Sequence, residues 1–184
     1  SSAASDVYKR QTRGADDAAG LAISEKLKGH IRGLRQAKRN SDDGISLIQT
    51  AEGGLTEISS IIIRLRELSI QAASDTVGDT ERGFSNIEFQ QLLDEVQRIS
   101  KGSEFNGRKL LDGSGGVVDI QVGIFNDPTQ DRITYDSTET DTTVESLGLL
   151  GESIAFKQGA QLSLTKLDDA LVRINGTRAN LGAL

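Results

Sequence analysis

A run of about 58 residues, from position 16 to position 73, contains no proline and carries an apolar residue at nearly every third or fourth position. This spacing is close to the 3.5-residue period of a coiled-coil seam, so it predicts one long helix with an apolar stripe. At about 1.5 Å per residue such a helix is about 85 Å long, which predicts an elongated molecule. The stripe consists of Ile23, Leu27, Ile31, Leu34, Ile45, Ile48, Ala51, Leu55, Ile58, Ile62, Leu65, Leu68 and Ala72.

Glycines interrupt this helix, and each costs about 1 kcal/mol relative to alanine in a helix interior. They are Gly20, Gly29, Gly33, Gly44, Gly53 and Gly54. Either close packing of neighbouring segments tolerates them, or the helix breaks at residues 42–44 and Ser41 or Asp42 caps a second helix. We expect a continuous helix because the apolar period resumes directly at Ile45.

Two further helices are expected, at about 80–101 and about 155–184. The composition of residues 74–79 is typical of a turn, and so short a connection makes the first two helices antiparallel neighbours. The apolar stripe expected on the second helix comprises Phe84, Ile87, Gln91, Val96 and Ile99, with Leu92 and Leu93 between them. The stripe expected on the last helix comprises Leu164, Leu167, Leu171, Ile174 and Leu181.

Between the second and the last expected helix, apolar residues recur at every second position. Residues 118–122 and 133–135 alternate apolar and polar side chains, as half-buried strands do. We expect a small hairpin within residues 104–136, followed by a polar, acidic loop at about 137–146. The chain is thus expected to have a leader at residues 1–12 and a single helical domain at residues 13–184. Its predicted fold class is mainly α, a rod-like bundle with coiled-coil seams and a small β-hairpin at one end.

The composition excludes several classes of protein. The 184 residues include no cysteine, one histidine and 4% aromatic residues. No disulfide, cysteine-based zinc site or thiol nucleophile is possible, and a site with several histidine ligands is excluded. No apolar stretch approaches the length of a membrane span, so no membrane insertion is expected.

No motif in the chain supports catalysis or cofactor binding. Asp16 and Asp17 point about 100° apart on a helix, so they fit a helix N-terminus better than a catalytic pair. His30 has no second histidine at metal-ligand spacing, and the glycine-rich residues 113–116 lack the lysine and helix of a phosphate-binding loop. We therefore expect no catalytic, cofactor-binding or metal-binding residues, and no enzyme.

Charge is distributed unevenly. Residues 1–40 carry a net charge of +5 and residues 41–150 a net charge of −12. The basic segment has no aromatic side chains interleaved with its charges, and the rest of the chain would repel phosphate, so nucleic acid is not an expected partner. Opposite charge at two ends of an elongated molecule favours head-to-tail packing of copies.

Short sequence blocks in a fixed order resemble those of bacterial flagellin. They are residues 13–26 (RGADDAAGLAISEK), 36–40 (QAKRN), 43–53 (DGISLIQTAEG), 66–73 (RELSIQAA), 104–113 (EFNGRKLLDG), 120–123 (IQVG), 147–149 (LGL) and 178–183 (RANLGA). Each block alone is a weak signal, but the ordered series extends over about residues 9–184. The chain is therefore identified as a member of this family.

The resemblance implies a structural subunit that polymerises with itself into the flagellar filament used for swimming. It implies export through the flagellum's own channel to the cell exterior, with flagellar export, cap and junction proteins as partners. Two alternatives remain open: a hook–filament junction protein, and a coiled-coil adaptor unrelated to motility. The adaptor would dimerise through its seams, whereas a flagellin should bury them within one chain.

The chain departs from the family pattern in three respects. Residues 1–8 do not match it, and the terminal helices that form the inner core of the filament are not found at either end. The usual outer variable domains are also missing, since about 20 residues separate Tyr135 from the last helix. We expect this 184-residue chain to fold but not to polymerise.

The resemblance also implies a possible contact with an animal Toll-like receptor. By motif, Arg64 and Leu68 match the receptor-binding arginine and leucine of the family, and Glu88 matches their acidic partner. An arginine and a leucine four residues apart share one helix face. The alternative is that Leu68 belongs to the seam and Arg64 to packing within the filament.

Overall fold

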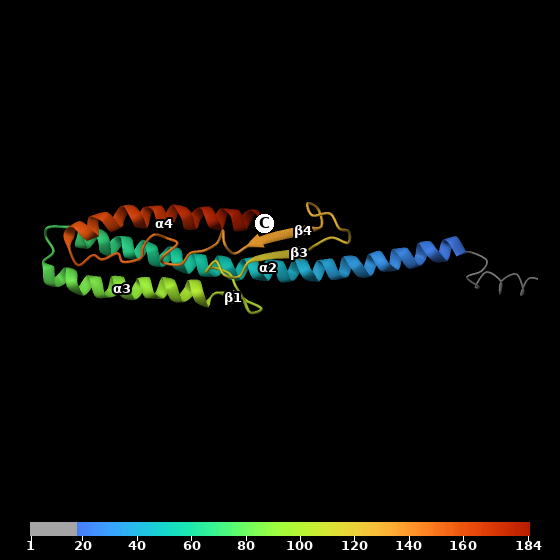
Figure 1. Ribbon diagram of the computed structural model, residues 1–184, viewed down its shortest axis with the longest axis horizontal. Coiled ribbons are helices and arrows are strands. Elements are labelled where there is room, and N and C mark those ends of the chain that lie inside the picture. Colours follow the sequence, from blue (N-terminus) through green and yellow to red (C-terminus); the bar gives the residue numbers. More distant parts are fainter. Residues whose placement is uncertain (1–17) are drawn as a thin grey trace, which may run out of the picture. The chain divides into compact units, whose positions relative to one another are not determined.

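The computed structural model describes residues 18–184. They form helices α2 (Ala18–Ala72), α3 (Asp79–Gly102) and α4 (Lys157–Ala183), and strands β1 (Glu104–Phe105), β2 (Arg108–Lys109), β3 (Val117–Gln121) and β4 (Arg132–Asp136) (Figure 1). This confirms the predicted mainly α class. The expected leader at residues 1–12 and the Asp16–Asp17 pair lie outside the described residues. None of the described helices is long and apolar enough to cross a membrane.

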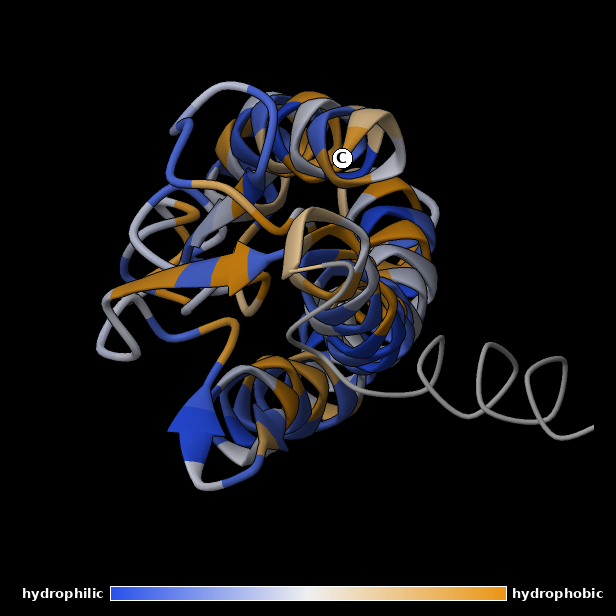
Figure 2. Cartoon of the chain, turned by 90° about the vertical axis from the view of Figure 1, so that its right-hand side faces the viewer, coloured by the Kyte–Doolittle hydropathy of each residue, from blue (hydrophilic) through white to orange (hydrophobic). Residues whose placement is uncertain are grey.

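The described residues fall into two compact units. One contains the part of α2 up to Asp43 together with Ile120–Ile133, and the other contains Gly44–Asp119 and Thr134–Leu184. Helix α2 continues without a break through Gly44, as expected, and Gly44 is itself buried. Apolar residues form bands along the helices and do not cover them all round (Figure 2).

The core of the second unit lies between α2, α3 and α4. Helix α2 contributes a buried face that repeats every three or four residues, and α4 contributes one that alternates strictly between steps of three and four. Such spacing is that of knobs-into-holes packing. The buried face of α2 includes Ala51, Leu55, Ile58, Ile62, Leu65, Leu68 and Ala72, and that of α4 includes Ala160, Ser163, Leu167, Ala170, Ile174, Thr177 and Leu181. Leu164 and Leu171, which we expected in this face, are only partly buried.

The predicted register of α3 is wrong. Phe84 and Ile87 are 68% and 57% exposed, whereas Phe89 is fully buried. Positions 84 and 89 lie about 140° apart on a helix, so only one of them can face α2. The face that packs consists of Arg82, Phe89, Leu93, Val96, Ile99 and Ser100.

The expectation that the whole seam of α2 is buried within one chain is also wrong. In the first unit Ile23, Leu27, Ile31 and Leu34 are each at least half exposed. The described segment that packs on this part of α2 is residues 120–133, which meets other positions: the Phe125 ring lies edge-on to His30 at 5.9 Å. Asn40 Nδ2 likewise donates to the Gln121 carbonyl at 2.9 Å. Among the described residues, this apolar stripe therefore stays uncovered.

Two neighbouring glycines of α2 have opposite surroundings. A Cβ atom on Gly54 would lie 2.7 Å from Leu111 Cδ1 and 2.8 Å from Ser103 Oγ, whereas one on Gly53 would meet nothing within 4 Å. Leu111 is fully buried and has little room to move. Gly54 is thus a glycine that close packing requires, as the continuous-helix interpretation supposed.

Substituting these two glycines by alanine should change stability in opposite directions. Gly53→Ala should raise the free energy of unfolding by about 0.5–1 kcal/mol through helix propensity. Gly54→Ala should lower it by about 1–2 kcal/mol, because overpacking of the Leu111 site outweighs that gain. Urea unfolding followed by circular dichroism measures both. Equal stabilisation by the two substitutions would contradict the described packing.

The strand region contains a second small hairpin that we did not predict. Strands β1 and β2 pair antiparallel around Asn106 and Gly107, whose φ angles are +49° and +76°. Two consecutive left-handed residues are what a type I′ turn requires, and Asn-Gly favours it. Strands β3 and β4 form the other two-stranded sheet.

Residues 137–156, which we call the strap, are more buried and more extensively hydrogen-bonded than the polar loop we expected. The expected acidic loop is part of it, yet Ser137, Thr140 and Thr142 are buried. Polar side chains of α3 bind its backbone: Asn86 Oδ1 accepts from the Ile154 amide at 2.9 Å, and Gln97 Oε1 from the Val144 amide at 2.9 Å. Further bonds run from Gln90 Nε2 to the Glu152 carbonyl (2.8 Å) and from Ser100 Oγ to the Thr142 carbonyl (2.7 Å).

Candidate interaction surface

Arg64 and Glu88 meet across the α2–α3 contact, as the resemblance suggested. Arg64 Nε donates to Glu88 Oε1 at 3.0 Å, and Arg64 Nη1 donates to Glu67 Oε2 at 3.0 Å. The hydrogen bond to Glu67 and then that to Glu88 raise the pKa of the Arg64 guanidinium above its ordinary value. The Arg64 and Glu88 side chains are both about half exposed, so the pair is accessible from outside.

Leu68, the third residue of this set, lies in the core. It is 3% exposed and belongs to the buried face of α2. A position four residues from Arg64 shares its side of the helix, but Leu68 is buried in the core cluster whereas the longer Arg64 side chain is half exposed. The structure therefore brings Arg64 and Glu88 together and places Leu68 in the core.

Two further ion pairs link segments of the second unit. Arg66 Nε lies 2.6 Å from Asp168 Oδ1 of α4, and this hydrogen bond raises the pKa of Arg66. Lys157 Nζ lies 2.7 Å from Asp75 Oδ1 and lowers the pKa of the Asp75 carboxyl. Exposed pairs of this kind contribute little to stability.

The outward side of α3 combines exposed apolar and acidic side chains. Phe84 and Ile87 lie on it with Glu81, Glu88 and Asp94, and we call these five residues the α3 face. At about 100° per residue they lie within an arc of about 140°, with Phe84 and Ile87 between Glu81 and Glu88 on one edge and Asp94 on the other. Glu81 and Asp94 form no ion pair with any described residue. We had assigned Phe84 and Ile87 to the core. The sequence signal that favours the observed register of α3 over the expected one is the seven-residue spacing of Arg82, Phe89 and Val96.

A basic stripe follows one side of α2 in the first unit. Lys28, Arg32, Arg35 and Arg39 recur at steps of four, three and four, and all four are exposed. Lys28 pairs with Glu25 at 2.8 Å and Arg39 bonds to Gln36, whereas Arg32 and Arg35 form no ion pair within residues 18–184. We call these four residues the α2 basic stripe. They are four of the nine basic residues in the positively charged segment 1–40.

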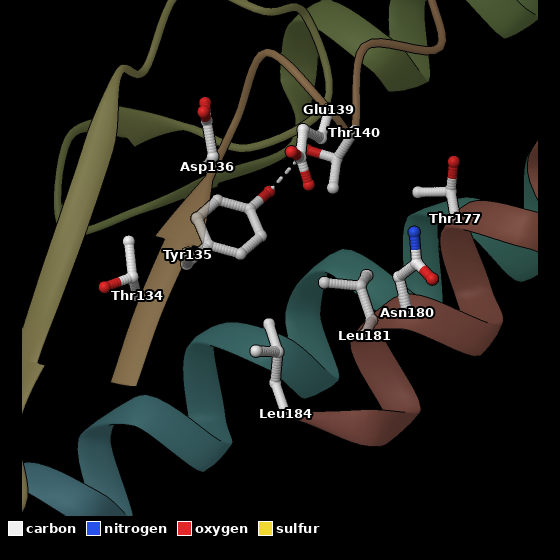
Figure 3. Close-up of a pocket in the computed structure, with 9 residues that line it drawn as sticks. All are labelled: Thr134, Tyr135, Asp136, Glu139, Thr140, Thr177, Asn180, Leu181 and Leu184. Atoms are coloured by element: carbon white, nitrogen blue, oxygen red, sulfur yellow. Dashed lines mark hydrogen bonds between the residues drawn. The ribbon is translucent and has the colours of Figure 1, made fainter. Parts of the chain in front are cut away.

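A small pocket lies beside β4 in the second unit, and its polar groups are structural (Figure 3). The Tyr135 hydroxyl donates to the Leu110 carbonyl at 2.5 Å and lies 2.8 Å from Thr140 Oγ1. Burial of the ring raises the pKa of the Tyr135 phenol. Asn180 and Leu181 of α4 lie across from the ring. In the part of the chain that is described, no group of three or more acidic, histidine or cysteine side chains is placed to hold a metal ion.

Comparison with known proteins finds sequence similarity to bacterial flagellar proteins. Residues 9–115 match the model of the bacterial flagellin N-terminal helical region. The chain is 44% identical over 175 residues to a flagellin of Halalkalibacterium halodurans, covering 95% of this chain and 63% of that protein. It is 40% identical over 190 residues to the flagellar filament 30.7 kDa core protein of Treponema maltophilum, covering 95% of this chain and 65% of that one.

A solved structure agrees with these matches. The crystal structure of Bacillus cereus flagellin superimposes with a TM-score of 0.70 at 34% identity, covering 79% of this chain and 81% of that chain. The chain spans less than two thirds of the length of the two relatives compared above.

Proposed function

The chain belongs to the bacterial flagellin family, and from this we propose that it is a structural subunit of the flagellar filament, which polymerises with itself to support swimming. The observation that carries the proposal is the match over 95% of the chain to a flagellar filament core protein. The exposed apolar and charged helix faces suit contacts between protein surfaces, which agrees with a structural role.

We propose further that the protein reaches the cell exterior through the flagellar export channel. Its other partners would then be the flagellar export, cap and junction proteins. These partners come from the family assignment, and the described residues contain no surface that we assign to any one of them.

Deleting the gene in its native bacterium tests this role. A filament subunit predicts loss of filament and swimming, both restored by a plasmid copy. A hook–filament junction protein predicts a different result, since the actual subunits would continue to be exported and would accumulate as monomers in the medium. Filaments of normal length on the deletion strain, in the absence of another flagellin gene, would contradict the proposal.

A second proposed role is recognition by an animal Toll-like receptor through the Arg64–Glu88 pair. The support is the exposure of both side chains and their mutual hydrogen bond, since arginine often anchors protein interfaces. Leu68 would act indirectly, by packing beneath Arg64 and holding α2 against α3.

The matched pair of arginines on α2 tests the receptor role. Arg64→Ala should weaken receptor signalling by about tenfold, the effect of losing one moderate anchor. Arg66→Ala is the control, because Arg66 is similarly exposed and ion-paired but lies toward α4. Dose–response curves in receptor-expressing cells give the comparison. Unchanged signalling by Arg64→Ala would refute the assignment.

A further inference from the structure

We infer that the α2 basic stripe of one copy docks on the α3 face of a second copy. The inference rests on the proposed filament function and names the two surfaces that a subunit would use. The partner is a second copy because the chain itself carries both surfaces, with opposite charge and similar length along the helix axis.

The chemistry of the α3 face fits a basic helix. Phe84 is 68% exposed, and exposed acidic residues flank it and Ile87 along the helix, with Glu81 and Glu88 on one edge and Asp94 on the other. A guanidinium group can pair with these carboxylates and also stack on an aromatic ring. The long aliphatic stems of arginine and lysine can cover Phe84 and Ile87 while their charged ends reach the acids.

The dimensions of the two surfaces agree. The α2 basic stripe spans residues 28–39, about 16 Å along the helix axis, and the α3 face spans residues 81–94, about 20 Å. Arg32 and Arg35 at the centre of the stripe have no ion-pair partner among residues 18–184, and neither do Glu81 and Asp94. Pairing between copies would supply partners to all four.

The pairing also explains why assembly would continue beyond a dimer. The two surfaces are different parts of the chain, so each bound copy still presents one free surface of each kind. Such a heterologous interface does not pair a patch with itself, and it generates rings or open helical filaments.

Reversal of charge on one surface and then on both tests this pairing in the full-length gene product. R32E/R35E should raise the critical concentration for filament growth at least about tenfold, because like charges then face each other. Adding E81K/D94K to the same chain should bring that concentration back to within about threefold of the parent. R108E/R178E is the control with the same charge change, since Arg108 and Arg178 are exposed and belong to neither surface.

The outcomes separate the inference from the filament function. Impaired R32E/R35E with rescue by the fourfold variant, and normal growth of the control, supports the docking. Growth of R32E/R35E at the parent's concentration, or no rescue by the fourfold variant, overturns the docking while the filament function stands. A parent protein that forms no filament at all overturns both. Circular dichroism of each variant verifies that it is folded.

Discussion

Phe89→Ala should lower the free energy of unfolding by about 3–5 kcal/mol, the usual cost of removing a fully buried aromatic side chain. The Phe89 ring has no exposed surface and lies in the core cluster between α2, α3 and α4. Its removal loses the free energy gained by burying the ring, and it leaves a cavity that the surrounding leucine and isoleucine side chains fill only in part. The measurement is urea unfolding monitored by circular dichroism.

Phe84→Ala is the matched control for this prediction. It removes the same side chain from the same helix five residues earlier, where the ring is mostly exposed, so the change should stay within about 0.5 kcal/mol. The comparison tests the register of α3 directly. A large loss for Phe84→Ala with a small one for Phe89→Ala would mean that α3 packs in the register we expected from the sequence.

Arg82→Ala should be the second most damaging change, with a loss of about 3 kcal/mol. The side chain is 8% exposed and holds the turn between α2 and α3 together. Its Nε donates to the Ala72 carbonyl at 2.8 Å, its Nη2 to the Ser74 carbonyl at 2.9 Å and its Nη1 to Asp79 Oδ1 at 2.6 Å. Removal takes the arginine donor from the buried Ala72 carbonyl and leaves the Ser74 carbonyl with only a 3.4 Å hydrogen bond from the Val77 amide. A buried polar group without its partner costs about 1–3 kcal/mol, and the loss of the Asp79 and Ser74 bonds adds to it.

Arg82→Lys distinguishes the shape of the donor from its charge. Lysine keeps the positive charge but presents a single ammonium group, which cannot reproduce the planar set of guanidinium donors. We expect it to recover less than half of the loss, measured by the same urea unfolding. Full recovery by lysine would show that the positive charge near Asp79 provides the stability. The hydrogen bonds that cap the end of α2 would then contribute little.

The extents of α2 and α4 could be predicted because buried positions recur at steps of three and four over several turns, within 51–72 in α2 and 160–181 in α4. The buried face of α4 could be predicted only in part, since Leu162 and Val172 are 61% and 73% exposed whereas Ser163 and Thr177 are buried. In α3 the apolar residues occupy two sides, since Phe84 and Ile87 are as apolar as Phe89 and Leu93. Period alone cannot tell which side the neighbouring helices cover.

The strap could not be predicted because its burial depends on partners far away in the sequence. A stretch rich in threonine and acidic residues is typical of a solvated loop, and nothing local indicates that Gln97 or Asn86 will bind its backbone. The meeting of Arg64 with Glu88 likewise joins positions 24 residues apart on two helices. It was indicated by the family resemblance and not by local pattern.

The exposed part of the α2 seam and the exposed α3 face were also outside the reach of sequence pattern. Apolar periodicity predicts that a stripe will be covered, but it does not distinguish cover within the chain from cover by another copy. The acidic residues around Phe84 and Ile87 indicate cover by another copy, but only after the structure has shown that this side of α3 faces outward.

Negative-stain electron microscopy of the purified full-length gene product tests the central claim most directly. We expect long, uniform helical filaments. Only monomers, or short closed rings, from the full-length protein would contradict its role as a filament subunit.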